Sequence, residues 1–353
     1  MADVTKNPTL DPLAGEGLSA SHTPTYARGA DKQEVIETLQ TYMSEADQNR
    51  KGGLNNRDDK WSENLNLYWN RHDFSKKSGW QAKESMPEVS NYVDRFAAAM
   101  KEALVAVPEG FYTVKDPADK ENDLAQSVKR LMDVWLTNVG RNQNGQILGF
   151  PAVFEEQMKM GSLMASSAVI TWKNDTPFGR VAIETQDPRN VWLDHTYRNL
   201  YRIRRIEVDR HELATMLGQR DSRGQSIYDL DEMEMLVNSL DMEQLREKEE
   251  LTGHGHQVVS GRSPVVLDEY IATVVDSNGK KLADRALMVL ANGQYLIRGP
   301  EKNPFWHGQD WLTYTPLIIA PLSVYGRSYM EDFGSVARTF NELTNMILDA
   351  VHV

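Results

Sequence analysis

The sequence VYGRSYMEDFGSVARTFNELTNMILDAVHV, residues 324–353, carries the longest helical pattern in the chain. Because a helical turn takes about 3.6 residues, apolar residues that recur every three or four positions share one face and predict a helix from Tyr329 to Val353. At about 1.5 Å per residue this helix spans roughly 37 Å, the width of a whole domain. The pattern runs to the last residue without a capping Gly or Asn, so we expect the helix to continue. Its apolar residues are Phe333, Val336, Phe340, Leu343, Ile347 and Val351.

The first half of the chain is expected to be mainly helical, because five more stretches repeat this spacing. Their apolar residues are expected to face the core, and the tryptophans on them, Trp61, Trp69 and Trp135, are interpreted as core packing. The predicted ranges are 32–48, 60–69, 87–107, 123–139 and 151–163. On the fourth, the expected core residues are Leu124, Val128, Leu131, Trp135 and Val139.

After Gly161 the apolar period shifts toward two, which is typical of β-strands. Residues 166–173 and 180–186 predict a hairpin, and Asn278 with Gly279 indicates the turn of a second one. The fold class is therefore α+β. The other predicted elements are an extended segment over 200–209, a helix over 210–217 with a capping box formed by Asp209 and Glu212, and an acidic helix over 229–251.

Composition limits the classes of function. The chain has 353 residues, with 39 Lys and Arg against 51 Asp and Glu, a net charge of −12. This acidity argues against a general grip on phosphate backbones and hence against a sequence-reading DNA-binding protein. Cys is absent, which excludes disulfides and thiolate metal ligands. No apolar run reaches the ~18 residues of a membrane helix, so we expect no membrane partner. Residues 1–30 are expected to form a flexible arm.

Enzymatic chemistry has no positive signal in the sequence. The G-x-S-x-G, H-E-x-x-H and G-x-x-x-x-G-K-[ST] signatures of serine hydrolases, zinc proteases and P-loop nucleotidases are missing. His254 and His256, in GHGH, lie in a Gly-rich stretch without a third ligand nearby. We expect no catalytic residue, no cofactor and no metal.

The concentrated basic segment lies between Arg198 and Arg205. Its members Arg202, Arg204 and Arg205 are candidates for a subunit interface, where they would meet the acidic helix 229–251 of a neighbouring copy. Two other interpretations stay open. The segment can contact a nucleic acid backbone, or it can be the solvated face of a half-buried strand.

Two tryptophans in the connection before the last helix are also candidates for an interface. Trp306 and Trp311 lie outside any helical stripe. A loop Trp anchors a partner or covers the edge of a core, since burying one large ring contributes about 2–3 kcal/mol.

Three segments together resemble a known family. They are TQDPRNVWLDHTYRNLYRIRRIEVDRHELATML (185–217), GWQAKESMPEVSNYVDRFAAAMKEAL (79–104) and NGQYLIRGPEKNPFWHGQDWLTYTPLIIAPLSVYGRSYMEDFGSVARTFNELTNMILDAV (292–351). Taken from about residue 60 to the end, the chain resembles the portal, or head-to-tail connector, proteins of tailed bacteriophages, particularly of short-tailed phages. The resemblance lies in the order of the segments, since none of them is an invariant signature.

The resemblance implies a ring of identical subunits, usually a dodecamer, at one capsid vertex of the virion. Such a ring is assembled in the cytoplasm of the host bacterium and conducts double-stranded DNA during packaging and ejection. The implied partners are the terminase packaging motor, capsid and scaffolding proteins, and tail adaptor proteins. The motor is a separate protein, so the absence of an ATPase motif agrees with the resemblance.

The resemblance also implies an organisation of the subunit. Residues 31–228 correspond to a wing of helices and β-segments, and residues 229–353 to the stem and clip. The last helix would be a stem helix, with Arg338, Asn341 and Asn345 as candidates for the channel surface. The crown that follows the stem in the family is absent from this sequence.

Two other functions stay open on the sequence alone. The chain can be a different virion component that shares such helices and strands, such as a head-tail adaptor or a scaffold-binding protein. It can also be an enzyme of unrecognised type, which the absence of motifs disfavours.

Overall fold

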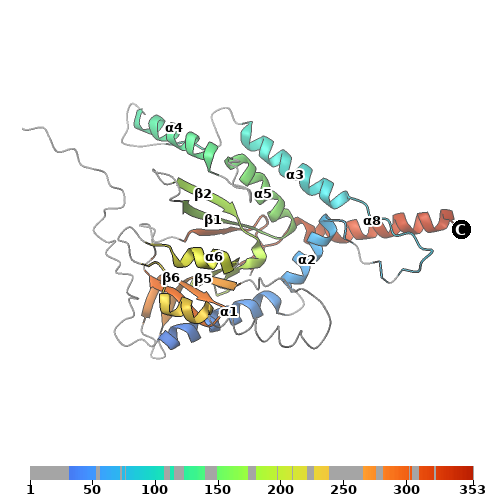
Figure 1. Cartoon of the computed structure of the whole chain (residues 1–353). Coiled ribbons are helices and arrows are strands. Elements are labelled where there is room, and N and C mark those ends of the chain that lie inside the picture. Colours follow the sequence, from blue (N-terminus) through green and yellow to red (C-terminus); the bar gives the residue numbers. More distant parts are fainter. Residues whose placement is uncertain are drawn as a thin grey trace, which may run out of the picture. The chain divides into compact units, whose positions relative to one another are not determined.

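The computed structural model of the chain is a mixed helix and sheet structure (Figure 1). The expected arm over 1–30, the stretch 238–264 with His254 and His256, and Trp306 lie outside the described residues. The side chains of 166–182, 210, 211, 214, 217 and 352 are likewise not described. The described residues are 32–52, 56–71, 74–75, 77–106, 112–114, 123–139, 149–173, 180–196, 198–208, 210–220, 226–237, 265–275, 281–301, 303, 310–321 and 323–352.

The chain divides into two compact units that each combine distant segments. Unit 1 comprises Met1–Tyr42 and Ile203–Gly308, and unit 2 comprises Met43–Arg202 and Gln309–Val353. Distant segments share a unit because antiparallel pairing gathers strands from separate parts of the chain into one sheet. The division after residue 228 that the resemblance implies stays a prediction.

Unit 2 contains most of the helices, and the helical predictions from the spacing of apolar residues are confirmed. The helix α1 (Lys32–Lys51) begins in unit 1 and ends in unit 2. The others are α2 (Arg57–Tyr68), α3 (Glu88–Val105), α4 (Asp123–Asn138), α5 (Phe150–Leu163) and α8 (Tyr329–His352).

Unit 2 also holds a three-stranded sheet of order β2-β1-β8. The predicted hairpin is confirmed as β1 (Ser166–Lys173) and β2 (Arg180–Thr185), which pair antiparallel. The late strand β8 (Leu312–Thr315) pairs antiparallel with the other edge of β1. A short 3-10 turn, η2 (Pro188–Asn190), leads into β3 (Val191–Leu193).

The core of unit 2 is built around Trp61, which is fully buried. Its ring meets the Tyr325 ring edge to face at a centroid distance of 5.9 Å. Burial raises the pKa of Tyr325 to about 12, so its hydroxyl stays neutral and accepts a 3.0 Å hydrogen bond from the Leu193 amide. The residues that complete this core come from α2, α3, α5, α8 and the strands: Leu67, Val89, Val93, Leu163, Met164, Ala165, Val191, Leu193, Leu312, Met330 and Ala337.

Unit 1 is organised on long antiparallel strands. The strands are β4 (Tyr201–Val208), β5 (Val265–Val275), β6 (Lys281–Ala291) and β7 (Tyr295–Glu301), and the order in their sheet is β3-β4-β5-β6-β7. The hairpin predicted from Asn278 and Gly279 is confirmed by the pairing of β5 with β6, although the turn itself is not described.

Two helices cover one face of this sheet. They are α6 (Arg210–Leu217), which was predicted, and a helical stretch over 230–237, the described part of the predicted acidic helix. Leu213 and Met233 from these helices are fully buried against sheet residues such as Leu267 and Val289. The helix α1 also contacts the sheet, since the Tyr42 hydroxyl donates a 2.9 Å hydrogen bond to the Thr273 carbonyl.

No helix in the described ranges is long and apolar enough to cross a bilayer.

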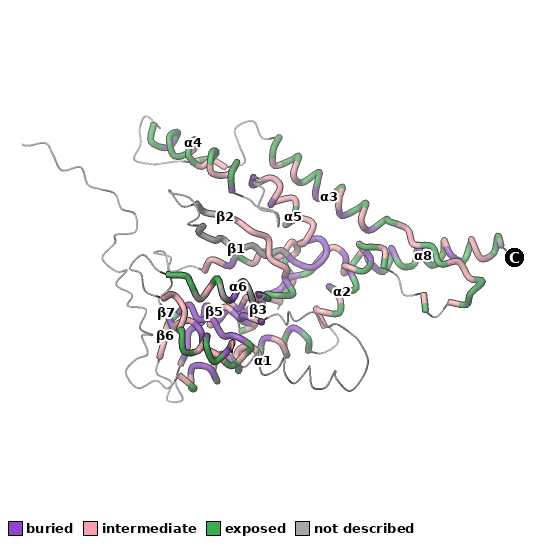
Figure 2. The backbone as a smooth tube through the Cα atoms, in the orientation of Figure 1, coloured by how far each residue is buried: buried purple, intermediate pink, exposed green. Residues whose placement is uncertain are grey.

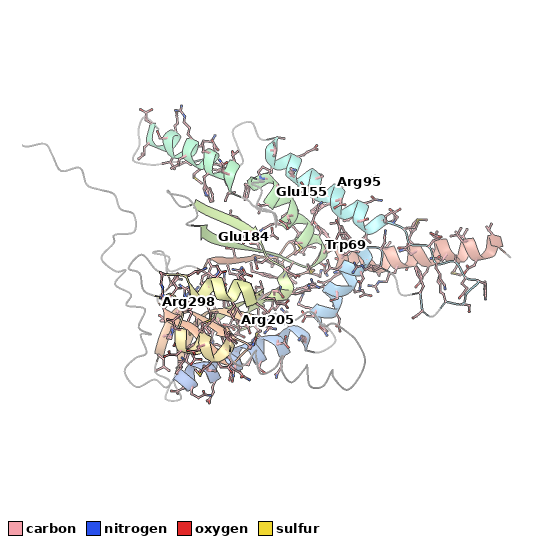
Figure 3. All side chains as sticks on the ribbon, in the orientation of Figure 1. Trp69, Arg95, Glu155, Glu184, Arg205 and Arg298 are labelled. Carbon is pink, nitrogen blue, oxygen red and sulfur yellow. The ribbon has the colours of Figure 1, made fainter. Side chains whose placement is uncertain are left out.

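The stability of unit 2 is expected to depend on Trp61. The substitution Trp61→Ala leaves a cavity at the centre of the core and is expected to lower the free energy of unfolding by about 3–5 kcal/mol. Urea denaturation followed by circular dichroism measures the change. The matched control is Trp69→Ala, since Trp69 lies at the end of the same helix and is 63% exposed (Figure 3). Equal effects of the two substitutions would contradict this description of the core.

Candidate subunit interface

The helix α8 has one face that packs on its own subunit. It contacts α2, α3 and α5, and Phe333 stacks on Tyr92 of α3 with ring centroids 5.0 Å apart. Apart from Met330, the buried residues of α8 are small or carry a side-chain amide. They are Met330, Gly334, Ala337, Asn341 and Asn345.

The apolar stripe of α8 lies on a different face, which is exposed in the subunit (Figure 2). Because successive residues turn by about 100°, the stripe is centred about 120° around the helix from the buried residues. We call it the α8 stripe. Its members, with their exposed fractions, are Val336 (58%), Phe340 (48%), Leu343 (53%), Ile347 (63%) and Val351 (76%).

The helix α4 presents a second exposed stripe, and here the sequence prediction was wrong for three of its five core residues, while Val139 is buried as predicted. Leu124, Val128 and Leu131 were expected to face the core but are 61%, 38% and 70% exposed. Apolar periodicity defines a face of a helix without defining what covers that face. Trp69, also predicted as a core residue, is exposed, whereas Trp135 is half-buried.

A ladder of hydrogen bonds connects α8 to an extended segment, residues 82–86, which we call the strap. The amide oxygen of Asn345 accepts from the Glu84 N–H at 2.8 Å, and that of Asn341 from the Met86 N–H at 2.9 Å. Asp349 accepts a short hydrogen bond from the Ala82 N–H. The Asn345 amide also donates to the Glu84 carbonyl at 2.9 Å.

The hydrogen bonds of the ladder can form in register because the spacing of alternate residues in the strap nearly equals the spacing of every fourth residue in the helix. Two residues of extended chain rise about 6.6 Å, and four residues of helix rise about 6.0 Å. Alternate strap amides therefore meet every fourth residue of α8, and the strap runs antiparallel to the helix. Sequence reasoning missed the role of Asp349, although the four-residue spacing of Asn341, Asn345 and Asp349 was a signal for one polar face.

The structure places the three channel candidates differently from one another. Asn341 and Asn345 are 8% and 3% exposed and bind the strap, so the surface of the subunit does not offer these amides to a channel. Arg338 is exposed and forms a 2.9 Å ion pair with Glu63 of α2.

The arginine candidates of β4 pair with acids of their own subunit. Within unit 2, the Arg202 guanidinium contacts the Asp310 carboxylate at 3.0 Å. In unit 1, Arg205 donates two hydrogen bonds, of 2.8 and 3.0 Å, to the Asp268 carboxylate. Arg205 and Arg298 are labelled in Figure 3.

Arg204 pairs with an acid of β5, the strand that also carries the partner of Arg205. It contacts Glu269 at 3.3 Å, and burial raises the pKa of that carboxyl. Loss of the arginine would leave a carboxylate of the sheet unpaired and would strongly lower the stability of the fold. These contacts therefore stabilise the sheet of their own subunit. The predicted contact of this segment with an acidic helix of a neighbouring copy stays untested.

Of the two loop tryptophans, Trp311 is half-buried and packs against the core of unit 2. This contact corresponds to the expectation that a loop Trp covers a core edge. Trp306 lies outside the described residues.

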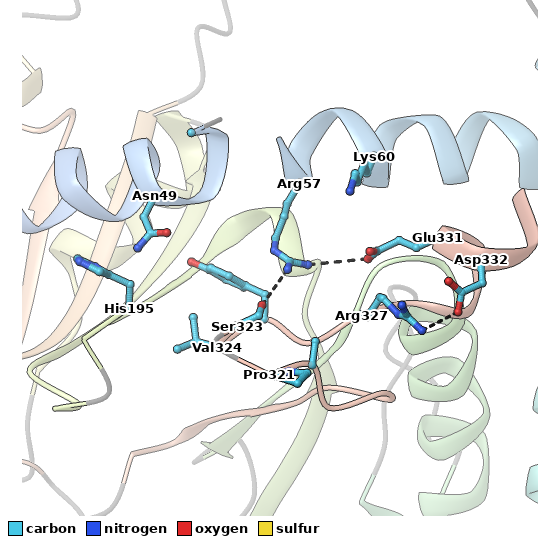
Figure 4. Close-up of a pocket in the computed structure, with 13 residues that line it drawn as sticks. Asn49, Arg57, Lys60, His195, Pro321, Ser323, Val324, Arg327, Glu331 and Asp332 are labelled. Carbon is cyan, nitrogen blue, oxygen red and sulfur yellow. Dashed lines mark hydrogen bonds and ion pairs between the residues drawn. The ribbon is translucent and has the colours of Figure 1, made fainter. Parts of the chain in front are cut away.

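A cavity of about 760 Å³ opens in unit 2 between the start of α2 and the start of α8 (Figure 4). Four of its charged side chains form two pairs. Arg57 donates to the Ser323 hydroxyl at 2.8 Å and lies 3.8 Å from Glu331, and Arg327 contacts Asp332 at 2.7 Å. The described residues contain no group of His, Cys, Asp and Glu that could hold a metal ion.

The comparisons with known proteins leave the family open. No protein-family model matches the chain, and no curated protein sequence matches it.

The strap is expected to depend on Asn345. The substitution Asn345→Ala removes the hydrogen bonds to the main-chain N–H and the main-chain carbonyl of Glu84. It is expected to lower the free energy of unfolding by about 1–3 kcal/mol. Hydrogen exchange by NMR should show faster exchange of the Glu84 amide. The control is Thr339→Ala, an exposed position on the same helix that should leave this amide protected. Unchanged exchange at Glu84 in the Asn345 variant would contradict the ladder.

Proposed function

We propose that the chain is the subunit of a portal ring in a tailed bacteriophage, which conducts double-stranded DNA through one capsid vertex. The observation that carries the proposal is the α8 stripe: a helix of 24 residues exposes its most apolar face in the isolated subunit. In the proposed ring α8 is a stem helix that runs along the channel. That the subunits form a ring is inferred from the resemblance of the sequence to portal proteins.

The exposed surface favours an assembly on physical grounds. Large exposed apolar patches mark surfaces that bind other molecules, and fully burying one exposed apolar side chain contributes about 1.5–3 kcal/mol. Because the five stripe side chains are 48–76% exposed, burying what remains of them would contribute on the order of 5–9 kcal/mol before the entropy of association is subtracted. Copies that join through two different faces form a closed ring when the rotation between them closes.

The charge of the chain suits a channel that lets DNA slide. With a net charge of −12 the subunit would repel the phosphate backbone more than hold it. The proposed partners are the terminase motor, capsid and scaffolding proteins and tail adaptors, and the proposed location is the virion. In this function the chain has no catalytic role.

Electron microscopy of the negatively stained, purified chain tests the ring. Closed rings with a central hole, near the size of a dodecamer, are expected. Monomers or dimers at all concentrations and salt conditions would contradict the ring, and would favour the alternative of another virion component such as an adaptor or scaffold-binding protein.

A charge in the α8 stripe is expected to prevent assembly without unfolding the subunit. Because Ile347 is 63% exposed in the isolated subunit, Ile347→Asp should leave the circular dichroism spectrum and melting temperature unchanged while rings are lost. Light scattering coupled to gel filtration measures the mass. Ser335→Asp, an exposed position of α8 away from the stripe, is the matched control and should still form rings. Rings of normal mass from Ile347→Asp would show that the stripe is not the contact.

A further inference from the structure

The α8 stripe and the strap lie at the same level along α8. Ala82 is bound by Asp349 and Glu84 by Asn345, so Lys83 lies at the level of Ile347. The stripe extends through this level, but on a different face of the helix. Each subunit therefore carries two separate surfaces at one height of the same helix.

The strap and the turn that precedes it also expose side chains on the surface of the subunit. Trp80 belongs to the turn that leads into the strap, where the Gln81 N–H donates to the Ser78 carbonyl at 3.1 Å, and its side chain is 70% exposed. Lys83 and Glu84 are exposed as well. An exposed Trp beside an ordered main-chain segment has the character of an interface anchor, since a rigid aromatic ring buries a large area at little entropic cost.

Cyclic symmetry restricts which surfaces can meet. Neighbouring copies in a ring are related by a rotation without a translation, so the two faces that touch lie at the same height along the axis. If α8 runs along the channel, the α8 stripe of one copy must meet a surface at its own height on the next copy. The strap with Trp80 meets this condition.

We propose that the α8 stripe of each subunit packs against the strap of the next subunit, with Trp80 and Lys83 at the level of Ile347 and Val351. This inference rests on the proposed ring. It names the contact that holds the ring together in its stem. It also gives the ladder a second role, because these hydrogen bonds fix the height along α8 at which the strap meets the next subunit.

The two surfaces differ in chemistry, as a contact between different faces requires. The stripe is apolar, whereas the strap presents the exposed Trp80 next to the exposed charges of Lys83 and Glu84. A pairing of two α8 stripes is less suitable, because contact between identical faces produces a closed dimer and no ring.

Cross-linking between differently labelled copies tests the contact. The chain has no Cys, so only engineered thiols react. Rings are assembled from a mixture of Lys83→Cys and Ile347→Cys chains and treated with a short bis-maleimide. A cross-linked dimer is expected from the mixture, and none from rings of either variant alone. Because each chain carries one thiol, a link within a chain cannot form.

The control mixture combines Lys83→Cys with Ser335→Cys. Ser335 lies on α8 about 18 Å along the axis from Ile347 and should give no cross-linked dimer. Rings from the first mixture without a cross-link would overturn this inference and leave the proposed ring intact. Absence of rings in the unmodified chain would overturn both. A dimer from Ile347→Cys alone would indicate pairing of identical stripes and also contradict the inference.

A second measurement compares Trp80 with Trp69, another exposed tryptophan. Trp80→Ala is expected to raise the subunit concentration needed for ring formation by about tenfold or more, as at a central interface residue, with an unchanged melting temperature of the monomer. Trp69→Ala, at 63% exposure, should leave that concentration unchanged. Equal effects of the two substitutions would count against the strap as the contact surface.

Discussion

The hydrogen-bond ladder between α8 and the strap is the constraint on which the exposed surface of unit 2 depends. Asn341, Asn345 and Asp349 use the inner face of the helix for main-chain amides, which no apolar side chain can satisfy. The carboxyl half of α8 is thus attached to its subunit by polar contacts. The apolar residues of this half lie on the outer face and are exposed in the subunit.

Both units contain arginine–carboxylate pairs. In unit 1, Arg204 and Arg205 neutralise acids of β5, and in unit 2 Arg202 neutralises Asp310. Removing one member of such a pair leaves a charge poorly solvated, which makes these arginines structural before they can serve any partner. Unit 2 also exposes the apolar stripes of α4 and α8, and exposed apolar surface of this kind is typical of association with protein more than with a phosphate backbone.

Most secondary structure could be predicted from spacing alone, because periods of 3.6 and 2 residues follow from backbone geometry. The helices α1 to α5 and α8 and the first hairpin were predicted in this way, whereas α6 was predicted from a capping box and the second hairpin from the turn residues Asn278 and Gly279. Whether the apolar stripe of a helix is buried could not be predicted from spacing. The stripe of α3 is buried at Val89 and Val93, whereas the equally regular stripe of α4 is exposed at Leu124 and Leu131. A one-dimensional pattern does not record which helix faces are covered.

The same distinction applies to the candidate site. The sequence by itself determined that α8 is a long helix with one apolar face, and that the chain is acidic and lacks Cys. Only the tertiary structure decided that Asn341 and Asn345 face inward, because their partners are main-chain amides more than 250 positions away along the chain. Main-chain groups are the same in every residue and leave no trace in the amino-acid sequence, so a contact with them becomes visible only when the chain has folded.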